Sequence, residues 1–285
     1  MSNYNGSPPW GPGQGPNQPQ PGQQNYYGQG QNTQQPGQPN YYGQGQNYQQ
    51  PYYNQAAVSQ PTAQALSSEA AFFQSVYLWM CSGLVITALT AYMIFNSSFR
   101  YTLISSKGLL LFIFLAQIGL VVLIGVLAKT ASPLVLRGLF LLYAASVGVT
   151  VSLLLVVYPQ NVIFKAFFSA SAVYGGMAVY GLVTKRSLQK WGAFLYMAAL
   201  GVIVALLINF IANSPMAHYV ISWFGVIIFA GLTAYDHQKL RVIHAGGFED
   251  STQESKVVIL GALTLFLDFI NLFIFIVRIM GAGRR

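Results

Sequence analysis

Seven apolar stretches separated by short polar connections occupy the chain from Glu69 onward. Each is close to the ~20 residues that a helix needs to cross the hydrocarbon core of a bilayer. Short connections favour antiparallel neighbours. The sequence therefore predicts an all-α membrane protein with seven transmembrane helices, near residues 71–95, 108–128, 134–157, 162–184, 191–213, 217–237 and 256–280.

Small residues recur at every fourth position in several of these spans. Such spacing lets helix backbones approach one another closely in lipid, and it predicts one compact bundle. The sets are Gly83, Thr87 and Ala91; Ala144, Gly148 and Ser152; and Gly201 with Ala205.

Composition supports a membrane protein and argues against a nucleic-acid partner. Only 7% of the 285 residues are charged and 54% are hydrophobic, whereas a soluble domain carries roughly 25% charged residues. The net charge of +8 reflects the scarcity of acids, six in all, because the fourteen Lys and Arg are scattered singly at the ends of apolar runs. The lone Cys81 excludes an internal disulfide framework.

The distribution of basic residues predicts the orientation. Basic residues favour cytoplasmic loops, and a cytoplasmic N-terminus places eight of them inside against three outside. The N-terminus shows no pattern of a cleavable signal peptide, so the first span is expected to direct insertion. The inner set is Lys129, Arg137, Lys185, Arg186, Lys190, Lys239, Arg241 and Lys256, and the outer set is Arg100, Lys107 and Lys165.

Residues 1–66 form a compositionally distinct tail that contains no Asp, Glu, Lys or Arg. Gln, Pro, Gly, Tyr and Asn dominate it, and the octet NYYGQGQN at 25–32 recurs at 40–47. Such a segment has too little aliphatic surface to form a core and is expected to be disordered. The predicted organisation is a disordered tail (1–66) followed by a membrane domain (67–285). The tail is interpreted as a flexible spacer or as a segment for partner binding or clustering.

Two of the six acids lie inside predicted spans and are the candidates for chemistry. Asp236 falls at the end of the sixth span and Asp268 well inside the seventh. An ionisable residue at membrane depth is costly and is a functional-site hypothesis by default. Two carboxyl groups in contact do not both ionise easily, so they tend to share a proton. Such a pair could act as a pH-sensitive latch and, once ionised, offer the hard oxygen ligands that suit Ca²⁺.

Simple geometry does not settle whether the two carboxyl groups meet. If Gly246-Gly247 ends the sixth helix, Asp236 lies roughly 14 Å from that end, while Asp268 lies roughly 20 Å or more from the start of its own helix. Contact therefore requires a tilt, a kink or a shift. Asp268, Asn271 and Arg278 form a polar stripe on the last span, and the alternative is that Asp268 pairs with Arg278.

The remaining polar residues receive structural interpretations first. Asn209 is expected to hydrogen-bond between helices, with a path-lining role second. His218 and His244 are expected at the interface or in loops. The His and Cys residues do not have metal-ligand spacing, so no cofactor is expected, and Ca²⁺ enters only as a transported ion.

Several segments resemble the signature of the Bax inhibitor-1 family. They are GLTAYDHQKL at 231–240, LDFINLF at 267–273, GLVITALTAY at 83–92 and LFLLYAA at 139–145. The resemblance extends over about residues 70–281 with order and spacing kept, and LDFINLF resembles the bacterial branch most. It implies a seven-helix bundle with the last helix in the centre, in a bacterial inner membrane or an equivalent internal membrane.

The resemblance also implies a pH-responsive Ca²⁺ leak with a carboxyl pair as its sensor, at Asp236 and Asp268 here. Two positions depart from the family pattern. His237 replaces the usual Thr and adds a group that can titrate near neutral pH. Gln117 stands in the second span, where many relatives have an acid, which calls conduction into question.

Two other functions compete with a leak. An intramembrane aspartyl protease would also use two Asp residues on successive helices, but Leu265-Phe266-Leu267 replaces the Gly-x-Gly that such enzymes have before the second Asp, so an enzyme is not expected. The second alternative is a non-conducting regulator of a membrane-bound AAA protease, a stress or cell-death pathway, or another membrane protein.

Overall fold

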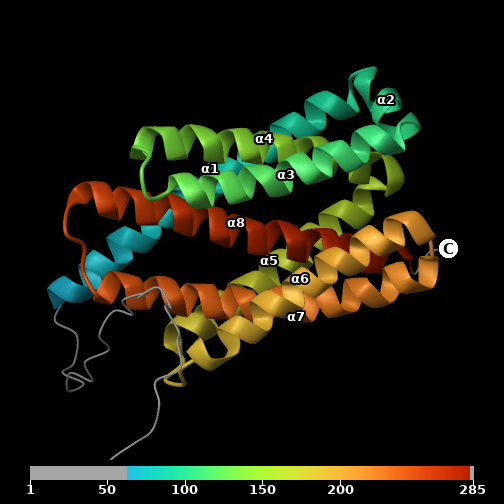
Figure 1. The fold of residues 1–285 in the computed structure, drawn as a ribbon. Coiled ribbons are helices and arrows are strands. Elements are labelled where there is room, and N and C mark those ends of the chain that lie inside the picture. Colours follow the sequence, from blue (N-terminus) through green and yellow to red (C-terminus); the bar gives the residue numbers. More distant parts are fainter. Residues whose placement is uncertain (1–62, 283–285) are drawn as a thin grey trace, which may run out of the picture. The chain divides into compact units, whose positions relative to one another are not determined.

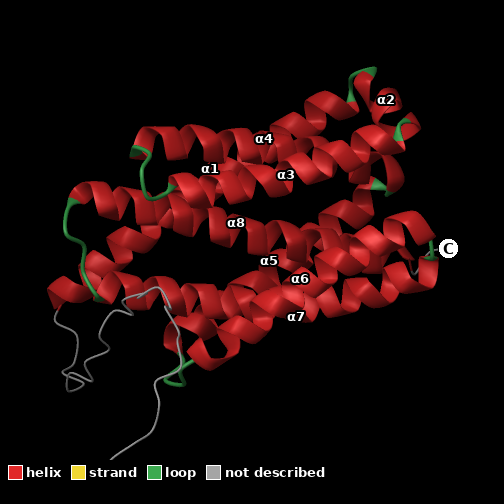
Figure 2. Ribbon diagram, viewed as in Figure 1, coloured by secondary structure: helices red, strands yellow, loops and turns green. Residues whose placement is uncertain are grey.

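The computed structural model describes residues 63–282, whose regular structure is entirely helical (Figures 1 and 2). Seven of the helices are long and apolar enough to cross a membrane, and α2 is a short helix between α1 and α3. The helices are α1 (Ala63–Phe95), α2 (Phe99–Ser105), α3 (Lys107–Leu127), α4 (Pro133–Val157), α5 (Gln160–Val183), α6 (Gln189–Ala212), α7 (Pro215–Ala245) and α8 (Ser251–Ala282).

The prediction of seven spans is confirmed, and the main differences lie at helix ends: α1 begins eight residues and α8 five residues before the predicted spans, and α7 ends later than predicted. The helix that begins at Pro215 continues to Ala245, eight residues beyond the predicted span, since its last turns are polar but still helical. The predicted tail lies outside the described residues, except that 63–66 belong to α1, so the described helix begins four residues earlier than the predicted boundary.

The last helix occupies the centre of the bundle, as expected. Two-thirds of the most apolar window of α8 is buried (67%), against at most 33% in any other span. It packs against α1, α4, α5 and α7, and Figure 1 shows it between a group formed by α1, α3 and α4 and a group formed by α5, α6 and α7. A helix that is apolar over most of its circumference is stable in such a core.

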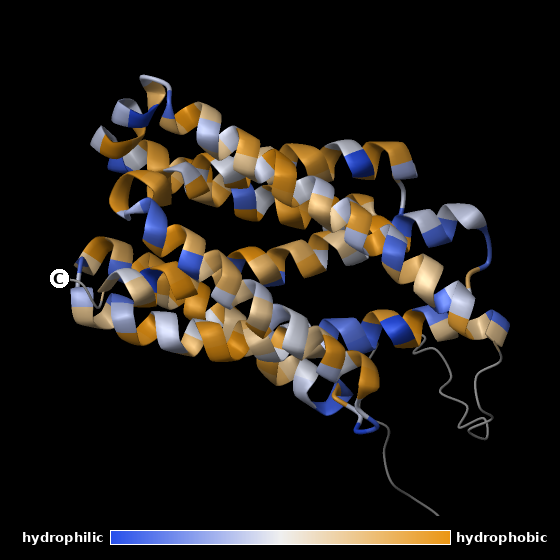
Figure 3. Cartoon of the chain, turned by 180° about the vertical axis from the view of Figure 1, so that it is seen from behind, coloured by the Kyte–Doolittle hydropathy of each residue, from blue (hydrophilic) through white to orange (hydrophobic). Residues whose placement is uncertain are grey.

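The outer faces of the other helices are apolar as well. Large hydrophobic side chains such as Phe112, Val126, Met197 and Ile211 are more than half exposed. Hydrophobic colour covers most of the helix lengths in Figure 3, and hydrophilic residues gather mainly near helix ends and connections. A surface of this kind is stable facing lipid.

Small residues bring α1 and α4 together, as two of the three predicted sets require. Thr87 Oγ1 donates a hydrogen bond to the backbone oxygen of Ala144 over 2.9 Å. A Cβ atom at Gly148 would lie 2.6 Å from Thr90 Cβ and 2.7 Å from the Thr87 oxygen, so only glycine fits there. The prediction is wrong for Gly201, which is exposed and has open space around it.

Candidate functional site

The structure brings the carboxyl groups of Asp236 and Asp268 into contact inside the bundle. The two residues are 1% and 3% exposed, their side chains interact, and Oδ2 of each has no hydrogen-bond partner among the described residues. An ionised carboxylate can only accept hydrogen bonds. Two neighbouring buried carboxyl groups can therefore hydrogen-bond to one another only when one of them carries a proton.

The contact arises from the way α7 and α8 are shifted along one another. Asp236 lies nine residues before the end of α7, whereas Asp268 lies seventeen residues after the start of α8. The same register places Gly261 against Leu240, and the ring of Phe275 at 5.8 Å from that of Phe229. The first turns of α8 therefore extend beyond the end of α7, and this shift removes the mismatch in depth that helix lengths alone suggested.

Tyr196 on α6 is a third member of the site that sequence reasoning missed. Its hydroxyl donates to Oδ1 of Asp236 over 2.6 Å. Its ring meets that of Tyr235 edge to face at 5.7 Å, and Tyr235 in turn lies against Gly192, where a Cβ atom would collide with the ring. Gly192 and Tyr196 lie one helical turn apart, but this spacing alone does not identify Tyr196 as a site residue.

Lys239 supplies the nearest positive charge and was also missed as a site residue. It lies one turn after Asp236 on α7 and interacts electrostatically with both carboxyl groups. Its Nζ atom lies 5.5 Å from the centre of the Tyr196 ring and 5.9 Å from that of Tyr235. The ammonium group thus remains near the pair without forming an ion pair with it.

His237 lies beside the pair but points into an aromatic cage. Its ring is 5.5–6.4 Å from the rings of Phe73, Tyr77 and Tyr174, and the residue is fully buried. Nδ1 donates to the backbone oxygen of Thr233 over 2.7 Å. No hydrogen bond between His237 and either carboxyl group is present in the described part of the chain, so its contacts are those of a packed core residue.

The other predicted polar residues do not assemble around the carboxyl pair. Asn271 donates to Leu267 of its own helix over 2.8 Å. Gln117 on α3 is buried and donates to the Ser146 oxygen at 2.8 Å and to Thr150 Oγ1 at 2.7 Å, which attaches α3 to α4. Asn209 bonds between helices, as expected, but at the far end of the bundle.

The alternative pairing of Asp268 with Arg278 is wrong. Ten residues separate them along α8, about 15 Å at 1.5 Å per residue. Within residues 63–282 the ion pair that forms joins Arg241 Nε to Glu69 Oε1 at 3.0 Å, on the partly exposed surface. That pair attaches the start of α1 to the end of α7, on the side of the bundle nearest Asp236.

The site does not form a ready-made metal centre. The described residues contain no group of three or more His, Cys, Asp and Glu side chains that could hold a metal ion. Ca²⁺ takes six to eight oxygen ligands. Two carboxyl groups supply at most four oxygens, so an ion at this position would need water or backbone oxygens in addition.

Comparison with known proteins now identifies the architecture. The family model described as "Inhibitor of apoptosis-promoting Bax1" matches residues 69–285. The chain belongs to the Bax inhibitor-1 family. The match covers every membrane-spanning helix apart from the first six residues of α1, so the Bax inhibitor-1 fold and the described bundle are the same unit.

Several bacterial proteins are similar to this chain in sequence. The inner membrane protein YbhL of Escherichia coli (strain K12) is 38% identical over 215 residues, which are 75% of this chain and 92% of YbhL. An uncharacterized protein of Deinococcus radiodurans is 38% identical over 225 residues (79% and 95%). One of Borreliella burgdorferi is 35% identical over 214 residues (75% and 92%). This chain is thus a multi-pass membrane protein that shares nearly the whole length of these relatives.

Proposed function

We propose that this Bax inhibitor-1 protein is a pH-sensitive cation leak, suited to Ca²⁺, that the Asp236–Asp268 pair gates. The observation that carries the proposal is a pair of interacting carboxyl groups on different helices, both almost fully buried within the membrane-spanning bundle. A purely structural role would be served at lower cost by neutral polar groups, since an ionisable group there costs about 2.5–3.5 kcal/mol.

In this mechanism the shared proton holds the closed state. Its loss leaves two negative charges in contact between α7 and the central helix α8. Unit charges ~4 Å apart repel by roughly 4 kcal/mol at an effective dielectric constant of about 20. Moving a two-state equilibrium from 1:99 to 99:1 takes about 5.5 kcal/mol. The repulsion therefore supplies most of the free energy for a switch, and the charge of Lys239 offsets part of it.

The separated carboxylates would then act as transient ligands for a passing cation. The Tyr196 hydroxyl is a third oxygen-bearing group at the same place, so the three side chains offer at most five oxygens. Since Ca²⁺ needs at least six oxygen ligands, water must supply the others. Incomplete coordination suits conduction, because an ion held by a full set of protein ligands leaves slowly.

The proposal also predicts which side of the membrane the carboxyl pair senses. The end of the bundle near Asp236 carries the Glu69–Arg241 ion pair, at the N-terminal end of α1. With a cytoplasmic N-terminus in a bacterial inner membrane, the carboxyl pair responds to cytoplasmic pH. The basic residues support this orientation, because the eight that flank this end favour the cytoplasm.

The test is Ca²⁺ flux into dye-loaded liposomes that contain the full-length protein, from about pH 6 to about pH 8, on either side of neutrality. The proposal predicts a flux that rises with pH over this range. Folded protein that conducts no Ca²⁺ at any pH would refute it, and protein-free liposomes give the background.

A non-conducting regulator is the second candidate, and one observation favours it. Residues 99–212, which contain α2 to α6, include no Asp or Glu. Gln117, where many relatives have an acid, is committed to hydrogen bonds within the bundle. A regulator that binds a membrane protease or another membrane protein needs no charged path through these helices.

A further inference from the structure

A cavity of about 820 Å³ lies at the end of the bundle opposite the carboxyl pair. It is bounded by the start of α3, the end of α4, the α6–α7 connection and the end of α8. Its size falls within the range of small-molecule sites, about 300–1,000 Å³. The cavity plays no part in the proposed gate.

A cation with an unpartnered Nη1 atom lines this cavity. Nη1 of Arg278 is shielded from solvent and makes no hydrogen bond to any described residue. Its guanidinium lies 5.6 Å from the centre of the Phe275 ring. The residues lining the cavity include no Asp or Glu among those described. A shielded charge at a membrane protein's edge is expected to have an anionic partner, and the described chain supplies none.

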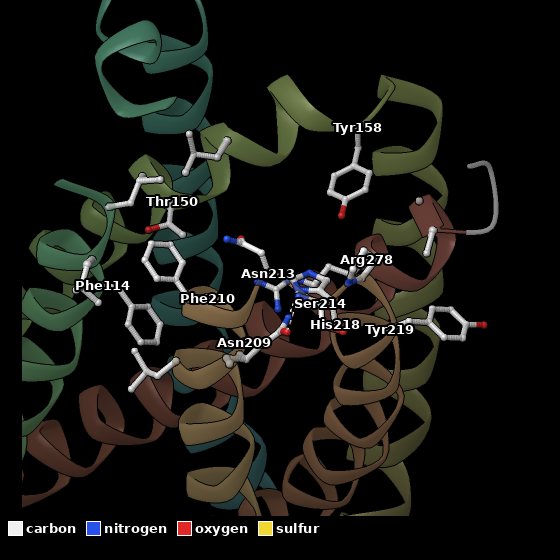
Figure 4. A pocket seen from close by; sticks show the side chains of 18 of the residues that line it. Phe114, Thr150, Tyr158, Asn209, Phe210, Asn213, Ser214, His218, Tyr219 and Arg278 are labelled. Carbon is white, nitrogen blue, oxygen red and sulfur yellow. Dashed lines mark hydrogen bonds between the residues drawn. The ribbon is translucent and has the colours of Figure 1, made fainter. Parts of the chain in front are cut away.

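The neighbouring polar groups are arranged to donate. Asn209 Oδ1 accepts from the backbone N–H of Ser214 at 3.1 Å, so its Nδ2 faces His218 Nδ1 at 3.3 Å. Since Nδ2 is a donor, Nδ1 must accept, and a neutral His218 then carries its proton on Nε2. Figure 4 shows Asn209, Ser214, His218 and Arg278 gathered in one region of the cavity.

Most of the remaining cavity wall is apolar, although Thr150, Tyr158, Asn213 and Tyr219 also line it. Side chains from three helices form it, among them Leu110, Phe114, Leu153, Leu206 and Phe210. In Figure 4 Phe114 and Phe210 lie to one side of the polar group. The wall therefore offers one polar region with donors and one cation, and a longer apolar region beside it.

We propose that this cavity binds an anionic phospholipid, with the phosphate at Arg278 and an acyl chain along α3, α4 and α6. Arg278 lies four residues before the end of α8, about 6 Å along the helix. A helix end at the outer edge of a headgroup layer ~5–7 Å thick would therefore place Arg278 where the headgroups meet the hydrocarbon core. The phosphate accepts hydrogen bonds from Arg278 and His218, and the chain fills the apolar wall.

Native mass spectrometry of the full-length protein in detergent tests the assignment. Phosphatidylglycerol is compared with phosphatidylcholine of the same acyl chains. The wild type is expected to prefer phosphatidylglycerol, and Arg278→Gln to weaken that binding roughly tenfold, as the loss of a charge-assisted hydrogen bond implies. Lys165→Gln is the matched control, because Lys165 is an exposed cation near the start of α5, at the same end of the bundle but outside the cavity wall.

Two further variants distinguish the binding of a lipid from the binding of a free anion. Leu153→Trp fills part of the cavity beside the apolar wall and should weaken phosphatidylglycerol binding at least as much as Arg278→Gln does. Arg278→Lys keeps the charge and should restore part of the binding lost in Arg278→Gln. Equal affinity of the wild type for the two lipids, or equal losses in Arg278→Gln and Lys165→Gln, would overturn the proposal. A free-anion site would give a different result: inorganic phosphate would compete with the lipid equally well in the wild type and in Leu153→Trp, and the wild type would show no preference between the two lipids. That result would also overturn the proposal.

Discussion

The hydroxyl of Tyr196 donates a hydrogen bond to Oδ1 of Asp236 over 2.6 Å. A helix that contributes no acid, α6, is thereby attached to the carboxyl pair between α7 and α8. A hydrogen bond to the charged form of a carboxyl group favours that form. Tyr196 therefore favours loss of the shared proton, and in the proposed mechanism this loss opens the leak.

Replacing this tyrosine should move the pH response of the flux. Tyr196→Phe removes the donor and keeps the ring, so the pH at half-maximal Ca²⁺ flux is expected to rise by about one unit, since a charge-assisted bond contributes about 1.5–3 kcal/mol and one unit corresponds to about 1.4 kcal/mol. Tyr180→Phe, at an exposed position on α5, serves as the control and should leave the midpoint unchanged. An unchanged midpoint in Tyr196→Phe would exclude this role.

His237 offers a competing explanation for any pH response, and its packing predicts that it is not the sensor. The ring contacts Phe73, Tyr77 and Tyr174 and bonds only to the backbone of its own helix. His237→Phe should therefore fill the same cage and keep the pH dependence of the flux. If the dependence disappears in a folded His237→Phe protein, the histidine and not the carboxyl pair is the titrating group.

The close approach of α1 and α4 makes a prediction about stability. Gly148→Ala forces a methyl group against Thr87 and Thr90, and overpacking of this kind costs about 1–3 kcal/mol. Gly201→Ala introduces the same methyl group on an exposed helix face with open space around it, where alanine gains up to about 1 kcal/mol in helix propensity. Unfolding in detergent should show Gly201→Ala as the most stable protein, the wild type next and Gly148→Ala as the least stable. Equal stability of the two variants would contradict the packing described.

The order and approximate length of the spans could be predicted because a helix that crosses the hydrocarbon core must be apolar for about 20 residues. The end of α7 and the starts of α1 and α8 could not, since these turns are polar but still helical, and a contact such as Glu69 with Arg241 holds the start of α1 against the end of α7. Small-residue spacing identified the faces of α1 and α4 but failed at Gly201, because the same spacing occurs on a face that meets lipid.

The candidate site was only partly predictable for a similar reason. Asp236 and Asp268 stand out as acids in apolar runs, whereas their contact depends on the shift between α7 and α8, which no single helix encodes. Tyr196 is one of 18 tyrosines in the chain. Its role becomes visible only when α6 is packed against α7, with Gly192 making room for Tyr235.

The tail separates the two candidate functions. Removing residues 1–62, just before α1 begins at Ala63, leaves the whole described bundle, so a leak gated by the carboxyl pair should keep its pH-dependent flux. A regulator that engages its partner through the tail should lose that partner in a crosslinking and pull-down comparison of the two proteins. Loss of flux from the shortened, folded protein would count against a gate built only from the bundle.

The most direct test of the carboxyl latch is the Ca²⁺ flux of Asp236→Asn and Asp268→Asn in liposomes from about pH 6 to about pH 8. An asparagine amide can donate to the remaining carboxylate but cannot ionise, so the pair stays joined at every pH. Each variant is expected to lack the rise of flux with pH and to stay at the level of the wild type at about pH 6. A wild-type pH profile in either folded variant would contradict the central claim.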